Sequence, residues 1–172
     1  MKKIIPNKIH IIGSVGSGKT TLARNLSHQF NIPFYELDNV IWTRNVSGDI
    51  RRTDEERDKL LSAIIRSDTW IIEGVHFHNW IFPSFDHADL IIFLDTVYSK
   101  RKFRIIKRFI RQKFGFEKAN YKPTFKLFKD MFKWNATFES QTKPELKNML
   151  SQRYKDKTIT LRDDIDIHKF FN

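Results

Sequence analysis

The stretch HIIGSVGSGKTTLARNL, from His10 to Leu26, places three glycines, a lysine and two threonines between an apolar run and a helix-like run. Residues 13–20 match the pattern G-x-x-x-x-G-K-[ST] at every position, in the strand–turn–helix context that the pattern requires. Glycines let the backbone wrap closely around an anion, and the following helix presents its positive end there. The stretch therefore predicts a phosphate-binding loop in a chain that binds a nucleoside triphosphate.

The side chains of this loop have separate predicted tasks. Lys19 supplies a mobile positive charge for the β- and γ-phosphates, and the Thr20 hydroxyl is placed to ligate Mg²⁺. The residues expected to contact ATP or GTP are Gly13, Ser14, Val15, Gly16, Ser17, Gly18, Lys19, Thr20 and Thr21. ATP and GTP are not distinguished by this pattern.

Five short apolar runs, at residues 8–12, 33–37, 69–73, 89–95 and 157–161, are spaced like the strands of an alternating α/β chain. Their near-continuous Ile, Leu and Phe content is typical of strands buried on both faces. The segments expected to be helical are 18–29, 53–66, 99–114, 125–134 and 144–154, with a short turn at 165–171. Repeated strand–helix–strand units with right-handed crossovers predict a three-layer α/β fold, which we expect over residues 1–172 as one domain.

Two of the expected helices have distinctive sequences. Thr53 and Glu56 have the spacing of a capping box at the start of the 53–66 helix. In the 99–114 helix, apolar residues recur at three- and four-residue steps and form one stripe on an otherwise basic helix. The stripe consists of Phe103, Ile106, Ile110 and Phe114.

The net charge of +11 is concentrated in one window. Residues 100–133 hold thirteen Lys or Arg against two acids, so this window carries the whole excess. Aromatic residues alternate with lysines at 122–134, as they do in segments that stack on nucleic-acid bases. Phe125, Phe128 and Phe132 nevertheless recur at helical spacing, which favours packing onto the basic helix. Nucleic-acid contact is therefore the less favoured interpretation.

Composition excludes several other classes of protein. The chain has no cysteine, which excludes disulfides and thiolate chemistry and suits a reducing cytoplasm. Its first apolar run is broken by Pro6 and Asn7, and no apolar stretch approaches the roughly 20 residues that span a bilayer. We expect a cytoplasmic protein without a signal peptide or membrane contact, and its oligomeric state is left open.

Acids that end apolar strands are candidates for the metal and acceptor sites. Glu73 ends one strand before Gly74 and is the first choice to hold the water shell of Mg²⁺, with Asp95 as the less favoured alternative. Asp38 ends another strand, and the carboxyl ends of parallel strands line the ligand crevice. We expect Asp38 to orient an acceptor hydroxyl or accept its proton.

Several motifs together resemble a known family. They are Gly13–Thr20, Leu37-Asp38 with Trp42 shortly after, Trp70-Ile-Ile-Glu73-Gly74, and Ile91-Ile-Phe-Leu-Asp95 followed by an arginine-bearing helix. In them the chain resembles the small, adenylate-kinase-like P-loop kinases of the nucleoside-monophosphate-kinase group. Within that group it is most similar to the bacterial topology modulation protein or FlaR-like family.

The resemblance covers nearly the whole chain and implies a five-stranded parallel sheet with strand order 2-3-1-4-5. It also implies a substrate-binding helical region at 39–66 and a lid region, with the basic helix, at 99–143. The family often has Asp before Gly at the end of the third strand, so Glu73 departs from it by one methylene.

By the same resemblance, arginines on the helix after strand four fold over the transferring phosphoryl group. Arg104 and Arg108 occupy that pattern, four residues apart and so on one helix face. Their guanidinium groups would neutralise charge that develops on the phosphoryl oxygens. Together with Lys19 and Asp38, they are the predicted catalytic residues.

The acceptor is expected between the second strand and the second helix, in a connection longer than a crossover needs. Arg44, Arg51 and Arg52 lie there and favour an anionic acceptor. His76, shortly after the presumed metal acid, is predicted to line the same pocket. Arg162 lies in the last strand-to-helix turn, where related kinases pack the adenine.

These residues together predict an ATP- and Mg²⁺-dependent phosphotransferase. It would move the γ-phosphoryl group to a nucleotide or to another small hydroxylated or anionic acceptor. Two other classes stay open: a DNA-associated ATPase or topology-modulating regulator that uses residues 100–133, and a nucleotide-binding switch with negligible turnover. The sequence does not identify the acceptor.

Overall fold

The computed structural model describes residues 6–45, 48–116 and 123–162. Its main sheet is built from β1 (Lys8–Gly13), β2 (Phe34–Glu36), β5 (Trp70–Gly74), β6 (Leu90–Leu94) and β7 (Thr158–Leu161). All neighbouring strands are parallel, in the order β2-β5-β1-β6-β7. Counted along the chain within this sheet, the order is 2-3-1-4-5, as the family resemblance implied. A separate antiparallel hairpin pairs β3 (Trp42–Thr43) with β4 (Ile50–Arg51).

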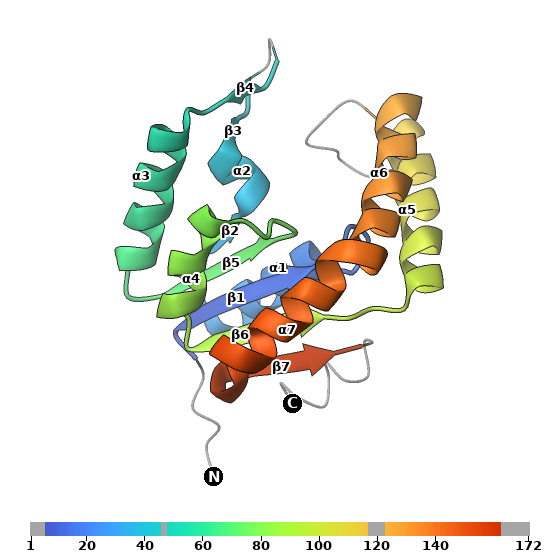
Figure 1. Cartoon of the computed structure of the whole chain (residues 1–172). Coiled ribbons are helices and arrows are strands. Elements are labelled where there is room, and N and C mark those ends of the chain that lie inside the picture. Colours follow the sequence, from blue (N-terminus) through green and yellow to red (C-terminus); the bar gives the residue numbers. More distant parts are fainter. Residues whose placement is uncertain (1–5, 46–47, 117–122, 163–172) are drawn as a thin grey trace.

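Helices form a layer on each side of the sheet (Figure 1). Helix α1 (Lys19–Phe30) packs on one face, and α3 (Asp54–Arg66), α4 (Phe82–His87) and α7 (Lys143–Arg153) pack on the other. Two arms extend past the carboxyl ends of the strands. One contains α2 (Leu37–Ile41) with the β3–β4 hairpin, and the other contains α5 (Tyr98–Lys113) and α6 (Phe125–Thr137). No described helix is both long enough and apolar enough to cross a membrane.

The core lies on both faces of the strands. Ile9 and Ile11 of β1 belong to the cluster that includes Leu22 and Leu26 of α1, whereas Ile12 belongs to the cluster under α3, α4 and α7. Because neighbouring residues of a strand point to opposite faces, a strand buried on both sides must be apolar almost without interruption. This explains why the strands stood out in the sequence as short continuous runs.

The predicted capping box of α3 is present. The Thr53 side chain accepts a hydrogen bond from the Glu56 amide at 3.2 Å, and the Glu56 carboxylate accepts one from the Thr53 amide at 2.9 Å. These bonds satisfy backbone donors that the first turn of a helix leaves unpaired. The helix therefore begins where the sequence indicated.

Some boundaries differ from the expectation. The segment after β2 turns at once into α2, so Asp38 lies in the first turn of a helix and not at a strand end. The helix expected at 125–134 is α6, which ends three residues later than expected and continues through a π-helical turn (Phe138–Thr142) into α7. The described residues also form two short 3₁₀ helices, Asn79–Ile81 and Lys155–Lys157. The turn expected at 165–171 lies outside the described residues.

The apolar stripe of the basic helix does not face the core. Its exposed fractions are 64% for Phe103, 40% for Ile106, 49% for Ile110 and 69% for Phe114. The buried side chains of α5 are instead Arg101, Ile105 and Gln112. Arg101 can be buried because its guanidinium forms an ion pair with Glu139, which compensates for its desolvation. The stripe was therefore predicted correctly, but this tertiary contact determines which way it points.

Candidate active site

A cleft lies beyond the carboxyl ends of the strands, between the two arms. It has a volume of about 1850 Å³ and is lined by the phosphate loop, α1, α2, the end of β5, α5 and α6. Typical small-molecule pockets enclose roughly 300–1,000 Å³. The cleft is thus large enough for two ligands side by side.

The phosphate loop joins β1 to α1 and needs its glycines. Gly16 and Gly18 have φ angles of 75° and 102°, in the left-handed region that other residues avoid. A Cβ at Gly13 would lie 2.8 Å from the backbone oxygen of Leu94 in the neighbouring strand. Glycine therefore allows both the turn itself and its close approach to β6.

Three other elements hold the loop in place. The Thr96 hydroxyl and the Arg104 guanidinium both donate hydrogen bonds to the Ser17 backbone oxygen, at 3.0 and 2.8 Å. The buried Ser14 hydroxyl donates to the side-chain oxygen of Asn135 on α6 at 3.1 Å. The loop is therefore fixed by contacts from the segment after β6, from α5 and from α6, which a local sequence pattern cannot reveal.

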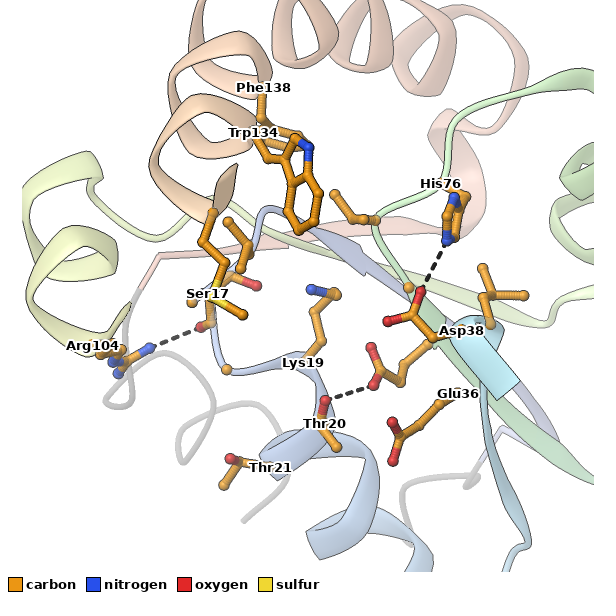
Figure 2. Close-up of a pocket in the computed structure, with 18 of the residues that line it drawn as sticks. Ser17, Lys19, Thr20, Thr21, Glu36, Asp38, His76, Arg104, Trp134 and Phe138 are labelled. Atoms are coloured by element: carbon orange, nitrogen blue, oxygen red, sulfur yellow. Dashed lines mark hydrogen bonds and ion pairs between the residues drawn. The ribbon is translucent and has the colours of Figure 1, made fainter. Parts of the chain in front are cut away.

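Lys19 extends from the start of α1 into the cleft, and Figure 2 shows it between Trp134 and Asp38. Its ammonium donates a hydrogen bond to the Ser14 backbone oxygen at 3.0 Å. Burial lowers the pKa of Lys19, and the carboxylates of Glu73 and Asp38 act against that effect. A lysine in this position favours a further anionic partner, because more negative charge nearby would stabilise its protonated form.

Thr20 and Glu73 meet beside the loop. The Thr20 hydroxyl donates to Glu73 Oε1 at 2.6 Å (Figure 2), and Glu73 is buried at the end of β5. Hard oxygen donors of these two types suit Mg²⁺, which usually keeps several waters and is shared with substrate phosphates. No described group of three or more His, Cys, Asp or Glu residues is arranged to hold a metal by itself. A magnesium ion here would therefore use Thr20 and Glu73 together with water and phosphate oxygens.

A second pair lines the same cleft near Glu73. His76 Nε2 and Asp38 Oδ1 are 3.0 Å apart, and both residues line the cavity. The hydrogen bond from His76 lowers the pKa of Asp38, although burial of the carboxyl group opposes this. Asp38 is therefore an anion at neutral pH, held in one orientation by the imidazole.

Glu36 is an acid that the sequence analysis did not single out. It is in register with Glu73 on the neighbouring strand and also lines the cleft. Its pKa is raised by burial and by the adjacent charges of Glu73 and Asp38. The strand pairing that brings these acids together could not be read from any local signal, although Glu36 lies only two residues before Asp38.

The two predicted arginines of α5 both line the cleft. Arg104 contacts the Ser17 backbone oxygen, and the charge of Arg108 contributes to the lowered pKa of Lys19. The four-residue spacing therefore does place both guanidinium groups on the side of α5 that faces the phosphate loop.

Asp95, the alternative metal acid, is not among the residues that line the cleft. Lys143 and Lys147 of α7 contact its two carboxylate oxygens at 2.7 and 2.8 Å. The end of β6 thus directs Asp95 toward α7 and away from Thr20. Of the two candidate acids, only Glu73 is brought to the phosphate loop.

The predicted substrate-binding arginines are separated by the structure. Arg44 lines the cleft and forms an ion pair with Asp49. Arg52 instead donates to two backbone oxygens at the end of α2, at 2.7 and 3.1 Å. Arg51 is exposed on β4 and does not line the cleft. Arg162, which was predicted to pack the adenine, is exposed after β7 and does not line the cleft either. The hairpin geometry thus leaves Arg44 as the member of this group that faces the cavity.

Helix α6 supplies an apolar wall that the sequence analysis missed. The residues concerned are spaced four, three and four apart, so they share one face, and they are Leu127, Met131, Trp134 and Phe138. A different face packs on α5, where Phe109 lies 4.4 Å from Phe128 between ring centroids. The expected packing of the α6 phenylalanines on the basic helix is therefore present, but it uses only part of the apolar sequence.

Sequence similarity to curated proteins is confined to a short segment. No protein-family model matches the chain. A curated shikimate kinase from Paracidovorax citrulli is 46% identical over 43 residues, which make up 25% of this chain and 23% of that protein. The chain thus matches less than a quarter of the length of this relative.

Solved structures align over almost the whole chain. A shikimate kinase from Bacteroides thetaiotaomicron has a TM-score of 0.51 at 16% identity, covering 96% of this chain and 94% of that one. A sugar kinase from Janibacter sp. HTCC2649 has a TM-score of 0.50 at 18% identity, covering 92% and 86%. Together with the strand order and the glycine-rich loop, this likeness shows that the chain has the α/β fold of the small P-loop kinases.

Proposed function

We propose that this protein is an ATP- and Mg²⁺-dependent kinase that phosphorylates a hydroxyl group of a nucleotide or another small acceptor. The observation that carries the proposal is the pairing of Thr20 with Glu73 at 2.6 Å in the same cleft as the Asp38–His76 pair. The first pair suits a nucleotide-bound metal and the second suits an acceptor hydroxyl. The shared fold of the kinase structures supports the same class of reaction.

In this proposal the backbone amides of residues 13–20 hold the β- and γ-phosphates, and Lys19 neutralises part of their charge. Thr20 and Glu73 would hold Mg²⁺, the latter through water. The ion would supply electrostatic stabilisation of the phosphate oxygens. Helix α6 contributes Trp134 as an apolar wall above Lys19, which limits the access of water to the γ-phosphate (Figure 2).

Phosphoryl transfer would proceed between the two pairs. The acceptor oxygen forms a bond to the γ-phosphorus while the bond to the β,γ-bridging oxygen breaks and ADP leaves. Arg104 and Arg108 compensate the charge on the equatorial oxygens. Because the pKa of Asp38 is lowered, its main task is to orient the acceptor hydroxyl, and it accepts the proton only late in the reaction.

The finer family assignment, to topology modulation or FlaR-like proteins, stays a prediction. A role in nucleic-acid binding is supported less well than a kinase role. Stacking on bases needs accessible aromatic faces, whereas Phe128 of α6 stacks on Phe109 of α5 and meets Phe132 edge-on. The acceptor half of the cleft is bounded by the α2 arm and α6, and Arg44 is placed to meet an anionic group there.

The test is a panel of nucleoside monophosphates, nucleosides, sugars and hydroxy acids, with ADP release and phosphorylated product as the readouts. Lys19→Ala should weaken ATP binding at least tenfold, and Asp38→Asn should keep ATP affinity while lowering kcat at least a hundredfold. Lys155→Ala, an exposed lysine far from the cleft, is the matched control. Unchanged nucleotide binding in Lys19→Ala, or tight ATP binding with no acceptor-dependent ADP release, would contradict the proposal.

A further inference from the structure

One face of α5 is apolar and exposed, although the helix is otherwise basic. The face is the stripe Phe103, Ile106, Ile110 and Phe114, whose exposed fractions are 40–69%. The other sides of α5 have different partners: Arg101 and Ile105 face the body of the protein, and Phe109 stacks on α6. Exposed apolar side chains in a continuous row are uncommon on a protein surface unless they bind something.

Basic residues border this stripe on both edges. At 100° per residue, Lys102 and Lys113 lie along one edge, and Lys100 and Lys107 lie along the other. The helix contains no Asp or Glu in its sixteen residues. Arg104 and Arg108 project from the opposite side into the cleft. A ligand on the stripe would thus meet an apolar strip between two rows of positive charge and leave the cleft open.

The apolar stripe and the lysines that border it together favour one kind of ligand over the others. A second copy of the helix would bring two acid-free basic surfaces together, and the like charges would repel. Nucleic acid would satisfy the lysines, but Ile106 and Ile110 at the centre of the stripe offer no face for base stacking. An anionic bilayer satisfies both features, because acyl chains accept Phe and Ile while acidic headgroups attract the flanking lysines.

We propose that α5 binds the surface of an anionic lipid bilayer, with its stripe inserted at the interface and its lysines against the headgroups. Apart from Lys107, which also lines the cleft, the surface lies outside the nucleotide cleft, and it does not depend on the proposed kinase activity. It revises the sequence-based expectation of no membrane contact, which rested on the absence of an apolar stretch long enough to span a bilayer. The helix would lie in the plane of the interface, because its apolar stripe is bordered by lysines along its length.

The test is co-sedimentation of the full chain with vesicles of phosphatidylcholine, with and without about one third phosphatidylserine. We expect binding to the anionic vesicles alone, weakened by added salt. Phe103→Ser combined with Ile110→Ser should reduce the binding at least tenfold, and Lys102→Glu should reduce it about fivefold or more. None of these side chains lines the cleft, so nucleotide binding should be unchanged.

Matched controls use exposed residues elsewhere. Ile50→Ser removes an apolar side chain that is 60% exposed on β4, and Lys155→Glu makes the same charge change far from α5. Both should keep the binding of the parent chain. The proposal fails if anionic vesicles do not bind, or if the control variants lose as much binding as the α5 variants.

Two further measurements on the same variants test the alternative ligands, which are a second copy of the chain and nucleic acid. A concentration-dependent dimer in sedimentation velocity that Phe103→Ser with Ile110→Ser abolishes would show self-association in place of lipid binding. Duplex or single-stranded DNA binding that Lys102→Glu weakens and the stripe variant does not, without vesicle binding, would show a nucleic-acid surface. Either result would overturn the lipid proposal.

Discussion

The stability of this protein should depend on pH through a histidine in the central strand. His10 is fully buried in β1, with its ring 4.4 Å from that of Phe85. The Ser84 hydroxyl lies 2.9 Å from His10 Nδ1 and itself donates to the Ile81 backbone oxygen at 2.7 Å. His10 Nδ1 therefore carries the proton, while Nε2 has no hydrogen-bond partner among the described residues. A second proton at Nε2 would be buried without an acceptor.

Burial lowers the pKa of His10 from 6.5 to about 3 in the folded protein. The folded state thus binds fewer protons than the unfolded chain, so its stability is complete above pH 6.5 and falls as the pH decreases toward 3. Between pH 7 and pH 5, this one group should remove about 2 kcal/mol of the free energy of unfolding. That is a substantial share of the roughly 5–15 kcal/mol that stabilises a typical domain.

The measurement is urea unfolding of the parent chain and of His10→Asn between pH 7 and pH 4. Asparagine retains an N–H near the position of Nδ1 but does not titrate, so other groups cancel when the two curves are subtracted. Below pH 6 the parent should lose stability faster than the variant by about 1.4 kcal/mol per pH unit. Parallel curves, or an NMR titration of the His10 ring with a pKa near 6.5, would refute the argument.

Substitutions at three further positions test the metal site and the packing around it. Thr20→Val should weaken Mg²⁺-dependent ATP binding at least tenfold, whereas Thr20→Ser, which keeps the hydroxyl, should remain within about threefold by calorimetry. Gly74→Ala should cost about 1–3 kcal/mol in urea unfolding and lower kcat, because its Cβ would lie 2.5 Å from Leu37 Cδ1, next to Asp38. Ser14→Ala should cost about 1–3 kcal/mol, because it leaves the buried side-chain oxygen of Asn135 unpaired; an unchanged unfolding midpoint would contradict this.

The parts of the site that could be predicted are those marked by residues close together in the sequence. The phosphate loop was recognised from glycines and a lysine at fixed spacing within eight residues, which is a local pattern. The Thr53–Glu56 capping box and the arginines four apart on α5 are local patterns too. In each case the residues that make up the pattern lie within eight positions of one another.

Other parts depended on contacts between distant segments. Glu73 and Asp95 have equivalent positions at strand ends in the sequence, but only the pairing of β1 with β5 brings Glu73 beside Thr20, while two lysines of α7 hold Asp95 elsewhere. Arg51 and Arg52 likewise turn away from the cleft with the β3–β4 hairpin. A linear pattern does not encode which of several similar acids or bases will face a common cavity.

The sequence by itself determined that this chain builds a phosphate loop within an alternating α/β fold, because both properties arise from short-range spacing and from apolar runs that must be buried. The tertiary structure decided which acid joins that loop, that α6 forms a wall of the cleft, and that the stripe on α5 faces outward. Helix rotation is set by the ion pair of the buried Arg101 with Glu139 and by the stacking of Phe109 on α6. These are long-range contacts, and they exist only once the chain has folded.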